Sequence, residues 1–345
     1  MELNYIKGSR EEFFNFVDSI GLYGKVGIVS HIDLDGLASA VFLEEILKEK
    51  GIKIDYIDFT DIRKDMVKEI SVKLKEKGIT KVFFCDLGID SIDFEGFKEL
   101  REEMDVFLID HHPMNEEVKN WNNIIKTDSQ DCSAMTCFFL GEGIIDSEKW
   151  TWLNCAAIFS DFSYKEKKNL EYLQSVYPDV NYENISSTTP GINSRIIASG
   201  LVYYQGNEKY VYDLVKERNL EKLKEVHQII EDEVDRLVNE FGEKSKFYQE
   251  RKLYFYEIDT KFNLVSAITT LVSKMKPEYT FVFMQRWKGI LKFSARNQSG
   301  SVDVGALMKK CVDGLSDASG GGHKMAGSSK IQEKDKEIFM KRLLE

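Results

Sequence analysis

Short apolar runs and segments with helical spacing alternate through the first 160 residues of the chain. The runs that predict strands are 25–30, 52–59, 80–86 and 104–110. The intervening segments that predict helices are 36–50, 61–77 and 93–103. Gly51 and Gly78 follow two of these segments, at positions where glycine commonly ends a helix. Strands that alternate with helices predict an α/β domain with a mostly parallel, doubly wound sheet.

The pattern changes in the second half of the chain. Residues 133–245 are mainly helical, and the spacing over 218–241 predicts a helix with its apolar residues on one face. His227 lies off that face, so we expect it to be solvated. Near residue 251 the alternation returns, with strands, one helix over 263–276 and the hairpin signal WKG. The strands expected there are 253–259, 280–286 and 290–296.

These patterns predict two domains joined by a helix. The boundaries that we expect are 1–215 for the α/β domain, 216–249 for a helical linker and 250–345 for a smaller α+β domain. A chain of 345 residues is long enough for each domain to bury a core of its own.

Composition indicates a soluble, intracellular protein. The chain is 43% apolar and 30% charged, and no apolar run approaches the roughly 18 residues that a membrane helix needs. The five cysteines show no CxxC spacing and are interpreted as reduced thiols, which favours a cytoplasmic location. Cys85 alternates inward on a predicted strand, and we expect it in the core rather than at a site.

Charge is unevenly distributed along the chain, whose net charge is −11. Residues 251–345 hold 17 Lys and Arg against 10 Asp and Glu, a balance of +7. The remaining residues hold 30 against 48, a balance of −18. One interpretation is chance drift between two domains. The other is an acidic part that binds cations and a basic part that binds a polyanion.

Acidic and imidazole side chains follow three of the predicted strands, and another aspartate ends a later apolar run. They are His31, Asp33 and Asp35 in HIDLDG, Asp86 in CDLG, Asp110, His111 and His112 in DHH, and Asp161 in AAIFSDFSY. The carboxyl ends of parallel strands meet at one edge of a sheet, where ligands bind in doubly wound folds. We therefore expect these side chains to converge.

Converging carboxylates favour a site for metal ions. Anions gathered at one edge repel one another unless cations lie between them. Carboxylate and imidazole ligands without thiolate suit manganese, and their number suggests two ions that promote displacement at phosphorus. His111 would then be a ligand, and His112 would lie beside the ligands or face a phosphate. The alternatives are that Asp35 only caps the following helix and that the two histidines are structural.

The sequence ASGGGHKMAGSS near the C-terminus suggests a phosphate site. Gly320, Gly321 and Gly322 permit close backbone approach, so their amides could line a phosphate-sized concavity that His323 can reach. A flexible turn would look the same. Upstream, Ser294, Arg296 and Asn297 end a predicted strand, and Arg296 could bind a phosphate with its planar guanidinium. A surface salt bridge is the alternative for Arg296.

These motifs together resemble a known family. HIDLDG, CDLG, DHH and the later Asp161 resemble the four motifs of the DHH phosphoesterases, and SARN with GGGHKMAG resembles the DHH-associated C-terminal domain. The resemblance implies a two-domain phosphodiesterase with two manganese ions, for which Mg²⁺ or Co²⁺ could substitute, and with substrate held between the domains. One ion would be held by His31, Asp33 and Asp86, and the other by Asp35, Asp86, His111 and Asp161.

The resemblance also implies roles for the remaining residues. Asp110 would orient the groups around the ligands, while His112 and His323 would face the scissile phosphate. The Ser294, Arg296 and Asn297 segment and the glycines 320–322 would bind substrate phosphate or a terminal nucleotide. The fourth motif often has Thr-Gly after its aspartate, whereas this chain has Phe162-Ser163.

The function that this predicts is a manganese-dependent exonuclease that releases mononucleotides from single-stranded or short RNA or DNA. The resemblance ends with the GGGH domain and lacks the extra modules of large bacterial RecJ enzymes. This favours short substrates, or binding of substrate with help from a replication or repair protein. Formation of a homodimer is a further expectation. Hydrolysis of a cyclic dinucleotide or of 3′-phosphoadenosine phosphate is the alternative activity, and a non-catalytic replication scaffold is the alternative of another class. The aromatic candidates for base stacking are Tyr254, Phe255 and Trp287, the first two expected in the core.

Overall fold

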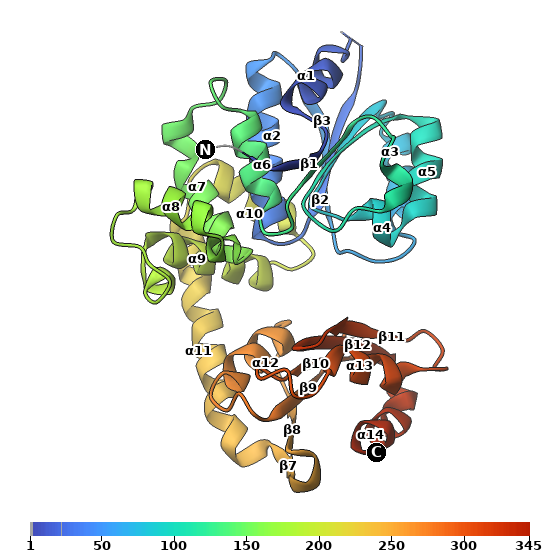
Figure 1. The fold of residues 1–345 in the computed structure, drawn as a ribbon, viewed down its shortest axis with the longest axis vertical. Helices are drawn as coiled ribbons and strands as arrows, with labels where there is room; N and C mark the ends of the chain where they lie inside the picture. Colours follow the sequence, from blue (N-terminus) through green and yellow to red (C-terminus); the bar gives the residue numbers. More distant parts are fainter. Residues whose placement is uncertain (1–2, 22) are drawn as a thin grey trace. The chain divides into compact units, whose positions relative to one another are not determined.

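A six-stranded sheet organises each half of the chain in this computed structural model, which describes residues 3–21 and 23–345 (Figure 1). The chain divides into two compact units, Met1–His227 and Gln228–Glu345. None of the helices in the described ranges has the length and apolar character that crossing a membrane requires.

The first sheet has the strand order β1-β6-β5-β4-β2-β3, and every neighbouring pair is parallel except β1 and β6. Its strands are β1 (Tyr5–Lys7), β2 (Val26–His31), β3 (Ile54–Thr60), β4 (Lys81–Cys85), β5 (Asp105–Asp110) and β6 (Ile124–Thr127). The chain runs from β2 outward to β3 and then returns to β4 on the other side of β2. The switch point, where ligands bind in such sheets, therefore lies between β2 and β4. The predicted doubly wound α/β fold is confirmed.

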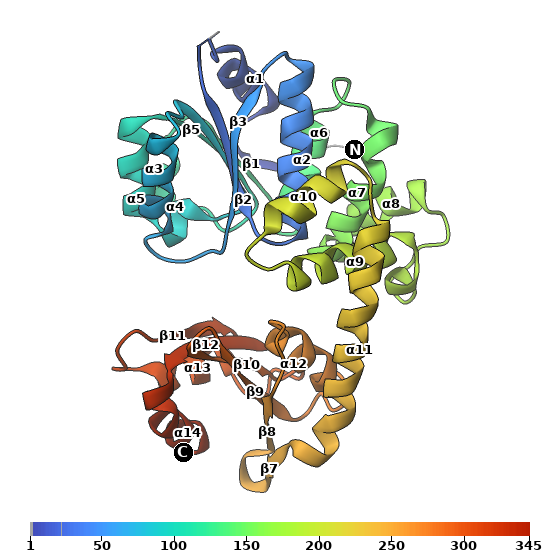
Figure 2. The same ribbon diagram turned by 180° about the vertical axis from the view of Figure 1, so that it is seen from behind.

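Helices cover both faces of this sheet, with α3, α4 and α5 on one side and α2 and α6 on the other (Figures 1 and 2). Each face has its own buried apolar cluster. The helices of this unit are α1 (Arg10–Asp18), α2 (Leu34–Glu49), α3 (Met66–Glu76), α4 (Ile89–Ile92), α5 (Phe94–Glu103), α6 (Ser133–Leu140), α7 (Ser147–Ser160), α8 (Lys167–Val176), α9 (Thr189–Tyr203) and α10 (Glu208–Lys216).

The central strands are apolar because they are covered on both faces. Residues 26–30 of β2 are all buried, as are residues 82–85 of β4, including the expected core residue Cys85. Gly51 and Gly78 have φ of 76° and 68°, and each follows the last residues of a helix, as predicted. The sequence pattern missed β1, α1 and β6, since two of these elements are only three and four residues long.

The boundary between the units falls within α11 (Glu221–Lys244). His227 on this helix was expected to be solvated, and that expectation is wrong. Its Nδ1 lies 2.8 Å from Ser199 Oγ on α9, and the residue is half-buried. A polar side chain off the apolar face of a helix can therefore still serve packing between helices.

The second sheet has the order β11-β12-β10-β9-β8-β7, and only β8 and β9 pair in parallel. The elements are β7 (Lys246–Tyr248), β8 (Leu253–Ile258), α12 (Val265–Ser273), β9 (Thr280–Trp287), β10 (Ile290–Arg296), α13 (Val304–Val312), β11 (Ser319–His323), β12 (Ala326–Gln332) and α14 (Lys336–Leu344). The predicted hairpin is present. Lys288 and Gly289, with φ of 48° and 83°, form its two-residue turn.

The glycine-rich stretch is a strand and not a flexible turn. Gly320 and Gly322 lie in β11, which pairs with β12 and packs on α13. A Cβ atom would lie 2.6 Å from Met308 O at Gly320 and 2.3 Å from Ala326 O at Gly322. At Gly321 a Cβ atom would meet nothing within 4 Å. Two of the glycines are therefore required by packing, and the middle one is not.

We expect Gly322→Ala to destabilise the second unit by about 1–3 kcal/mol, because the added methyl group overlaps the backbone of β12. Gly322 also has a backbone φ of 136°, which residues with a Cβ atom rarely adopt. Gly321→Ala is the matched control and should change the free energy of unfolding by less than about 1 kcal/mol. Urea unfolding of the full chain measures both, and equal stabilities would contradict this account.

Candidate active site

The carboxyl ends of three neighbouring strands bring most of the expected residues together. His31 is the last residue of β2, Asp86 follows β4 directly, and Asp110 is the last residue of β5. Because β4 pairs with both β2 and β5, these three ends are adjacent. His111 and His112 continue from β5 into the same region.

Asp86 lies between two histidines. Its Oδ2 is 3.5 Å from His31 Nδ1, and its Oδ1 is 3.3 Å from His111 Nε2. The Oδ1 atom also accepts a hydrogen bond from Ser133 Oγ at 3.2 Å. The residue has a left-handed backbone with φ of 60°, a conformation that Asp tolerates better than most side chains. Asp86 is nevertheless 2% exposed, so its carboxylate is held almost without water.

The two aspartates of HIDLDG have separate structural roles. Asp33 is the N-cap of α2, where its Oδ1 accepts from Gly36 N, and its Oδ2 lies 2.9 Å from His31 Nδ1. Asp35 lies in the first turn of α2 and does not cap it, so that alternative is wrong. It instead accepts hydrogen bonds from the backbone N–H groups of Ser133 at 2.9 Å and Ala134 at 2.7 Å, which begin α6. Asp35 is thereby tied to a helix 98 residues away.

Asp161 reaches the same group from α7, where it is the C-cap. Its Oδ2 lies 3.8 Å from His111 Nδ1, and that nitrogen is buried without a hydrogen-bond partner. A carboxylate at the C-terminus of a helix is disfavoured by the helix dipole. Burial raises the pKa of Asp161 to about 6, with Asp86 adding to the effect and His111 opposing it. These features favour a cation next to the Asp161 carboxylate.

The pKa values show how strongly the carboxylates crowd one another. Burial and the neighbouring Asp86 and Asp161 raise the pKa of Asp35. Burial opposes protonation of His31, but Asp33 and Asp86 outweigh it and raise the pKa to about 11. The pKa of His111 likewise rises to about 11, because Asp86 and Asp35 outweigh burial. Protonated imidazoles thus balance the negative charge of the carboxylates, which a metal cation would otherwise balance.

The donor atoms fit divalent cations. The donor atoms lie within 4.8 Å of one another inside each of three sets: His31, Asp33 and Asp86; Asp35, His111 and Asp161; and Asp86, His111 and His112. Asp86 belongs to two of the sets, so two neighbouring cations could share it, and the unpartnered His111 Nδ1 is a further available donor. All six expected ligands are brought together. Cation binding would displace the imidazole protons, so it should strengthen as pH rises.

His112 is more accessible than His111. The His112 side chain is 32% exposed and that of His111 is 10% exposed. His112 Nδ1 lies 2.8 Å from Asp110 Oδ1, and the backbone N–H of His112 donates to Asp110 Oδ2. With Nδ1 occupied by Asp110, Nε2 is the ring nitrogen of His112 that is left for another partner.

Sequence reasoning missed a buried ion network behind His112. Lys126 on β6 is fully buried, and its Nζ donates to Asp90 Oδ1 at 2.7 Å, to Asp110 Oδ2 and to the His112 carbonyl. Burial would raise the pKa of Asp110, but Lys126 and His112 outweigh it and lower the pKa well below its usual range. A lysine directly after the two isoleucines of the short segment IIKT was the available signal. Ser133 was also missed, since a serine at a helix start has many ordinary explanations.

The expected residues of the second unit lie around the end of β10. Arg296 forms no ion pair with any carboxylate in the described ranges, so the salt-bridge alternative is wrong. Its guanidinium instead donates to Thr270 Oγ1 at 3.0 Å, Ser266 Oγ at 3.1 Å and Ser294 Oγ at 3.3 Å. Asn297 is fully buried and hydrogen bonds with Thr280 and Ser301. His323 at the end of β11 is exposed.

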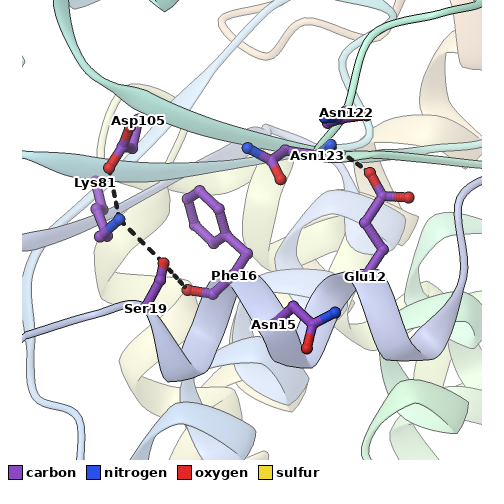
Figure 3. A pocket seen from close by; sticks show the side chains of 8 residues that line it. All are labelled: Glu12, Asn15, Phe16, Ser19, Lys81, Asp105, Asn122 and Asn123. Carbon is purple, nitrogen blue, oxygen red and sulfur yellow. Dashed lines mark hydrogen bonds and ion pairs between the residues drawn. The ribbon is translucent and has the colours of Figure 1, made fainter.

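A separate pocket of about 370 Å³ lies where β4 and β5 begin, at the opposite edge of the first sheet (Figure 3). Its charged groups already have partners. Lys81 contacts Asp105 and Ser19, and Glu12 accepts from the backbone N–H of Asn123. The pocket is therefore distinct from the acidic cluster and offers no unsatisfied charge.

Comparisons with known proteins agree with this fold. Residues 25–174 match the DHH family, N-terminal domain, and residues 250–345 match the DHHA1 domain, which together make up most of the chain. The chain belongs to the DHH family. The motifs HIDLDG, CDLG and DHH, on which the resemblance rested, lie within the first of these DHH-family regions. No curated protein matches the sequence.

Solved structures show the same fold at low identity to this DHH-family chain. RecJ from Thermus thermophilus in complex with Mn²⁺ has a TM-score of 0.72 and 13% identity over 100% of this chain and 55% of that one. The chain thus spans about half the length of that RecJ. Exonuclease RecJ bound to manganese gives 0.68 and 14%, over 99% and 94% of the two chains. CDC45 from Entamoeba histolytica gives 0.61 and 12%, over 98% and 99%.

Removing the buried ammonium should destabilise the first unit. We expect Lys126→Met to cost about 3–5 kcal/mol, because Asp90 and Asp110 are left buried without their counter-charge. Lys167→Met is the matched control, since Lys167 pairs with Glu171 on the exposed face of α8, and it should cost at most about 1 kcal/mol. Urea unfolding compares them, and a Lys126→Met protein as stable as the control would contradict the network described here.

Divalent cations should stabilise the first unit, because they relieve repulsion among the carboxylates. At a concentration 100-fold above Kd the gain is about 2.7 kcal/mol, which thermal unfolding detects as a higher Tm. Asp86→Asn should remove most of this shift, whereas Asp105→Asn at the opposite sheet edge should keep it. An undiminished shift in Asp86→Asn would place the cations elsewhere.

Proposed function

We propose that the chain is a manganese-dependent phosphodiesterase that acts as an exonuclease on single-stranded or short RNA or DNA and releases mononucleotides. The observation that carries the proposal is the convergence of His31, Asp33, Asp35, Asp86, His111 and Asp161 at the switch point of a doubly wound sheet. Imidazole and carboxylate donors without thiolate suit manganese, and Mg²⁺ or Co²⁺ could substitute.

The chain's own residues would divide the work. The six ligands would hold two divalent cations, with Asp86 shared between them. When bound, such cations lower the pKa of water and offset negative charge at phosphorus. His112, held at Nδ1 by Asp110, would direct an Nε2 proton toward a phosphate oxygen. Lys126 would keep Asp110 ionised, so that the imidazole stays in this orientation.

The second unit would bind the rest of the substrate. Its segment 251–345 has a charge balance of +7, which suits a polyanion. Arg296 is bonded only to hydroxyl and carbonyl groups, so its charge remains available for a phosphate. The open space at Gly321 and the exposed His323 offer further contacts. Asn297 and Ser294 are buried and would shape this surface rather than touch the substrate.

Product release from end-labelled RNA and DNA tests the proposal, with dinucleotides and longer single strands compared in manganese and in EDTA. We expect mononucleotides in manganese and none in EDTA. Asp86→Ala and His111→Ala should each lower the rate by roughly 10²- to 10³-fold, the scale on which preorganised electrostatic groups act. Asp105→Ala is the control and should cleave like the unmodified chain.

Three outcomes would redirect the proposal. Cleavage that survives EDTA, or wild-type rates in either ligand variant, would contradict the two-metal assignment. A manganese-loaded chain that hydrolyses cyclic dinucleotides or 3′-phosphoadenosine phosphate, but no oligonucleotide, would assign the same centre to small nucleotides. The complete set of ligands argues against a scaffold, for which no buried acidic cluster would be needed.

A further inference from the structure

The turn after Asp161 carries an exposed phenylalanine beside the acidic cluster, in contact with partly buried aromatic side chains. Phe162 follows Asp161 directly and is 51% exposed. Its ring centroid lies 6.3 Å from that of Tyr164, which in turn stacks on Phe159 at 5.6 Å with an interplanar angle of 11°. Phe159, Phe162 and Tyr164 are called the aromatic platform below.

Folding alone does not account for Phe162. Its φ of 59° is a left-handed conformation that bulky side chains rarely adopt, and its ring adds little to the core. The turn is nevertheless firmly held. Ser163 Oγ donates to Asp161 Oδ2 at 3.1 Å, and the Ser163 carbonyl accepts from Asn169 Nδ2 at 3.0 Å. Strain kept in a rigid turn next to a chemical centre is typical of a functional constraint.

A positive charge accompanies the platform. Lys165 Nζ lies 4.8 Å from the centroid of the Phe162 ring. The sequence DFSYKEKK, residues 161–168, thus interleaves aromatic rings and lysines immediately after a candidate ligand. Proteins that bind single-stranded nucleic acid combine such rings, on which bases stack, with cations that follow the backbone. A surface for a protein partner would not require a cation or the neighbouring carboxylate.

We propose that Phe162 stacks against a nucleobase of the substrate, with Lys165 beside a backbone phosphate. The inference rests on the proposed function. If Asp161 is a metal ligand of the proposed catalytic centre, the platform that follows it lies next to the cleaved phosphate. It narrows the substrate to nucleotides, as opposed to phosphoesters without a base. Stacking accepts every base, so the platform would select for the presence of a base and not for its identity.

The test compares substrates with and without a base in the nucleotide next to the cleaved linkage. Two single-stranded oligonucleotides are used, one with 2-aminopurine at this position and one with an abasic residue. In both, the linkage that would be cleaved is a phosphorothioate, which resists hydrolysis, so that binding can be measured in buffer with manganese. Fluorescence quenching reports stacking of 2-aminopurine, and a competition assay reports affinity for the abasic strand. Hydrolysis of the unmodified oligonucleotide is measured in parallel.

Phe162→Gly is the informative variant, because glycine adopts this backbone conformation without strain and the fold should be retained. We expect it to abolish the quenching and to weaken binding of the base-containing strand roughly 5- to 150-fold, as for loss of one stacked base. Affinity for the abasic strand should be unchanged. Phe162→Trp should keep wild-type binding, and so should Tyr23→Ala, which removes an aromatic side chain that is 96% exposed and lies just before β2.

Other results would overturn the inference. Equal affinity of Phe162→Gly and the unmodified chain for the base-containing strand would exclude stacking while leaving hydrolysis, and with it the proposed function, intact. Equal losses for both strands would indicate damage to the turn rather than loss of a base contact. If the unmodified chain hydrolyses no oligonucleotide in manganese, the proposed function fails, and this inference fails with it.

Discussion

Repulsion among buried carboxylates is the constraint on which the first unit depends. Asp35, Asp86 and Asp110 are held at one edge of the sheet with little water to screen them, and Asp161 reaches them from α7 with its side chain 28% exposed. Each is stabilised by a different device. Asp35 accepts hydrogen bonds from two backbone N–H groups of α6. Asp86 lies between the imidazoles of two histidines, and Asp110 contacts the buried ammonium group of Lys126. Asp161 has the least compensation, which agrees with its raised pKa.

The same devices connect distant parts of the chain. Ser133 bonds to Asp35 through its backbone and to Asp86 through its hydroxyl, so the start of α6 fixes carboxylates from two strand ends. Lys126 connects β6 with the residues after β4 and β5. Contacts of this kind are long-range in sequence, and each one specifies how strands and helices fit together as well as where a carboxylate points.

Much of the fold and of the acidic cluster could be predicted from the sequence, because both follow from periodic patterns. Strands covered on two faces are continuous apolar runs, and polar residues at their ends must meet if the strands are parallel. Lys126 could not be predicted in this way, because a buried lysine is specified by the carboxylates around it and not by its neighbours in sequence. The glycines of β11 were not predicted as a strand, since the sequence shows their conformational freedom but not the helix α13 that approaches them. Phe162 was noted only as a departure from the family's Thr-Gly, because neither its exposure nor its backbone conformation is a sequence property.

The origin of Asp161 has a consequence for the lifetime of the centre. Five of the six ligands come from the ends of sheet strands or the first turn of α2, whereas Asp161 comes from the end of α7 and depends on the turn tied to α8 by Asn169. Turns open locally at a lower free energy than the buried core of a domain. Opening of the turn 161–166 would remove Asp161 from the cluster while the sheet and α7, whose Trp150, Leu153 and Ile158 are buried in the core, stay folded. The persistence of the complete ligand set then depends on this turn rather than on the global stability of the unit.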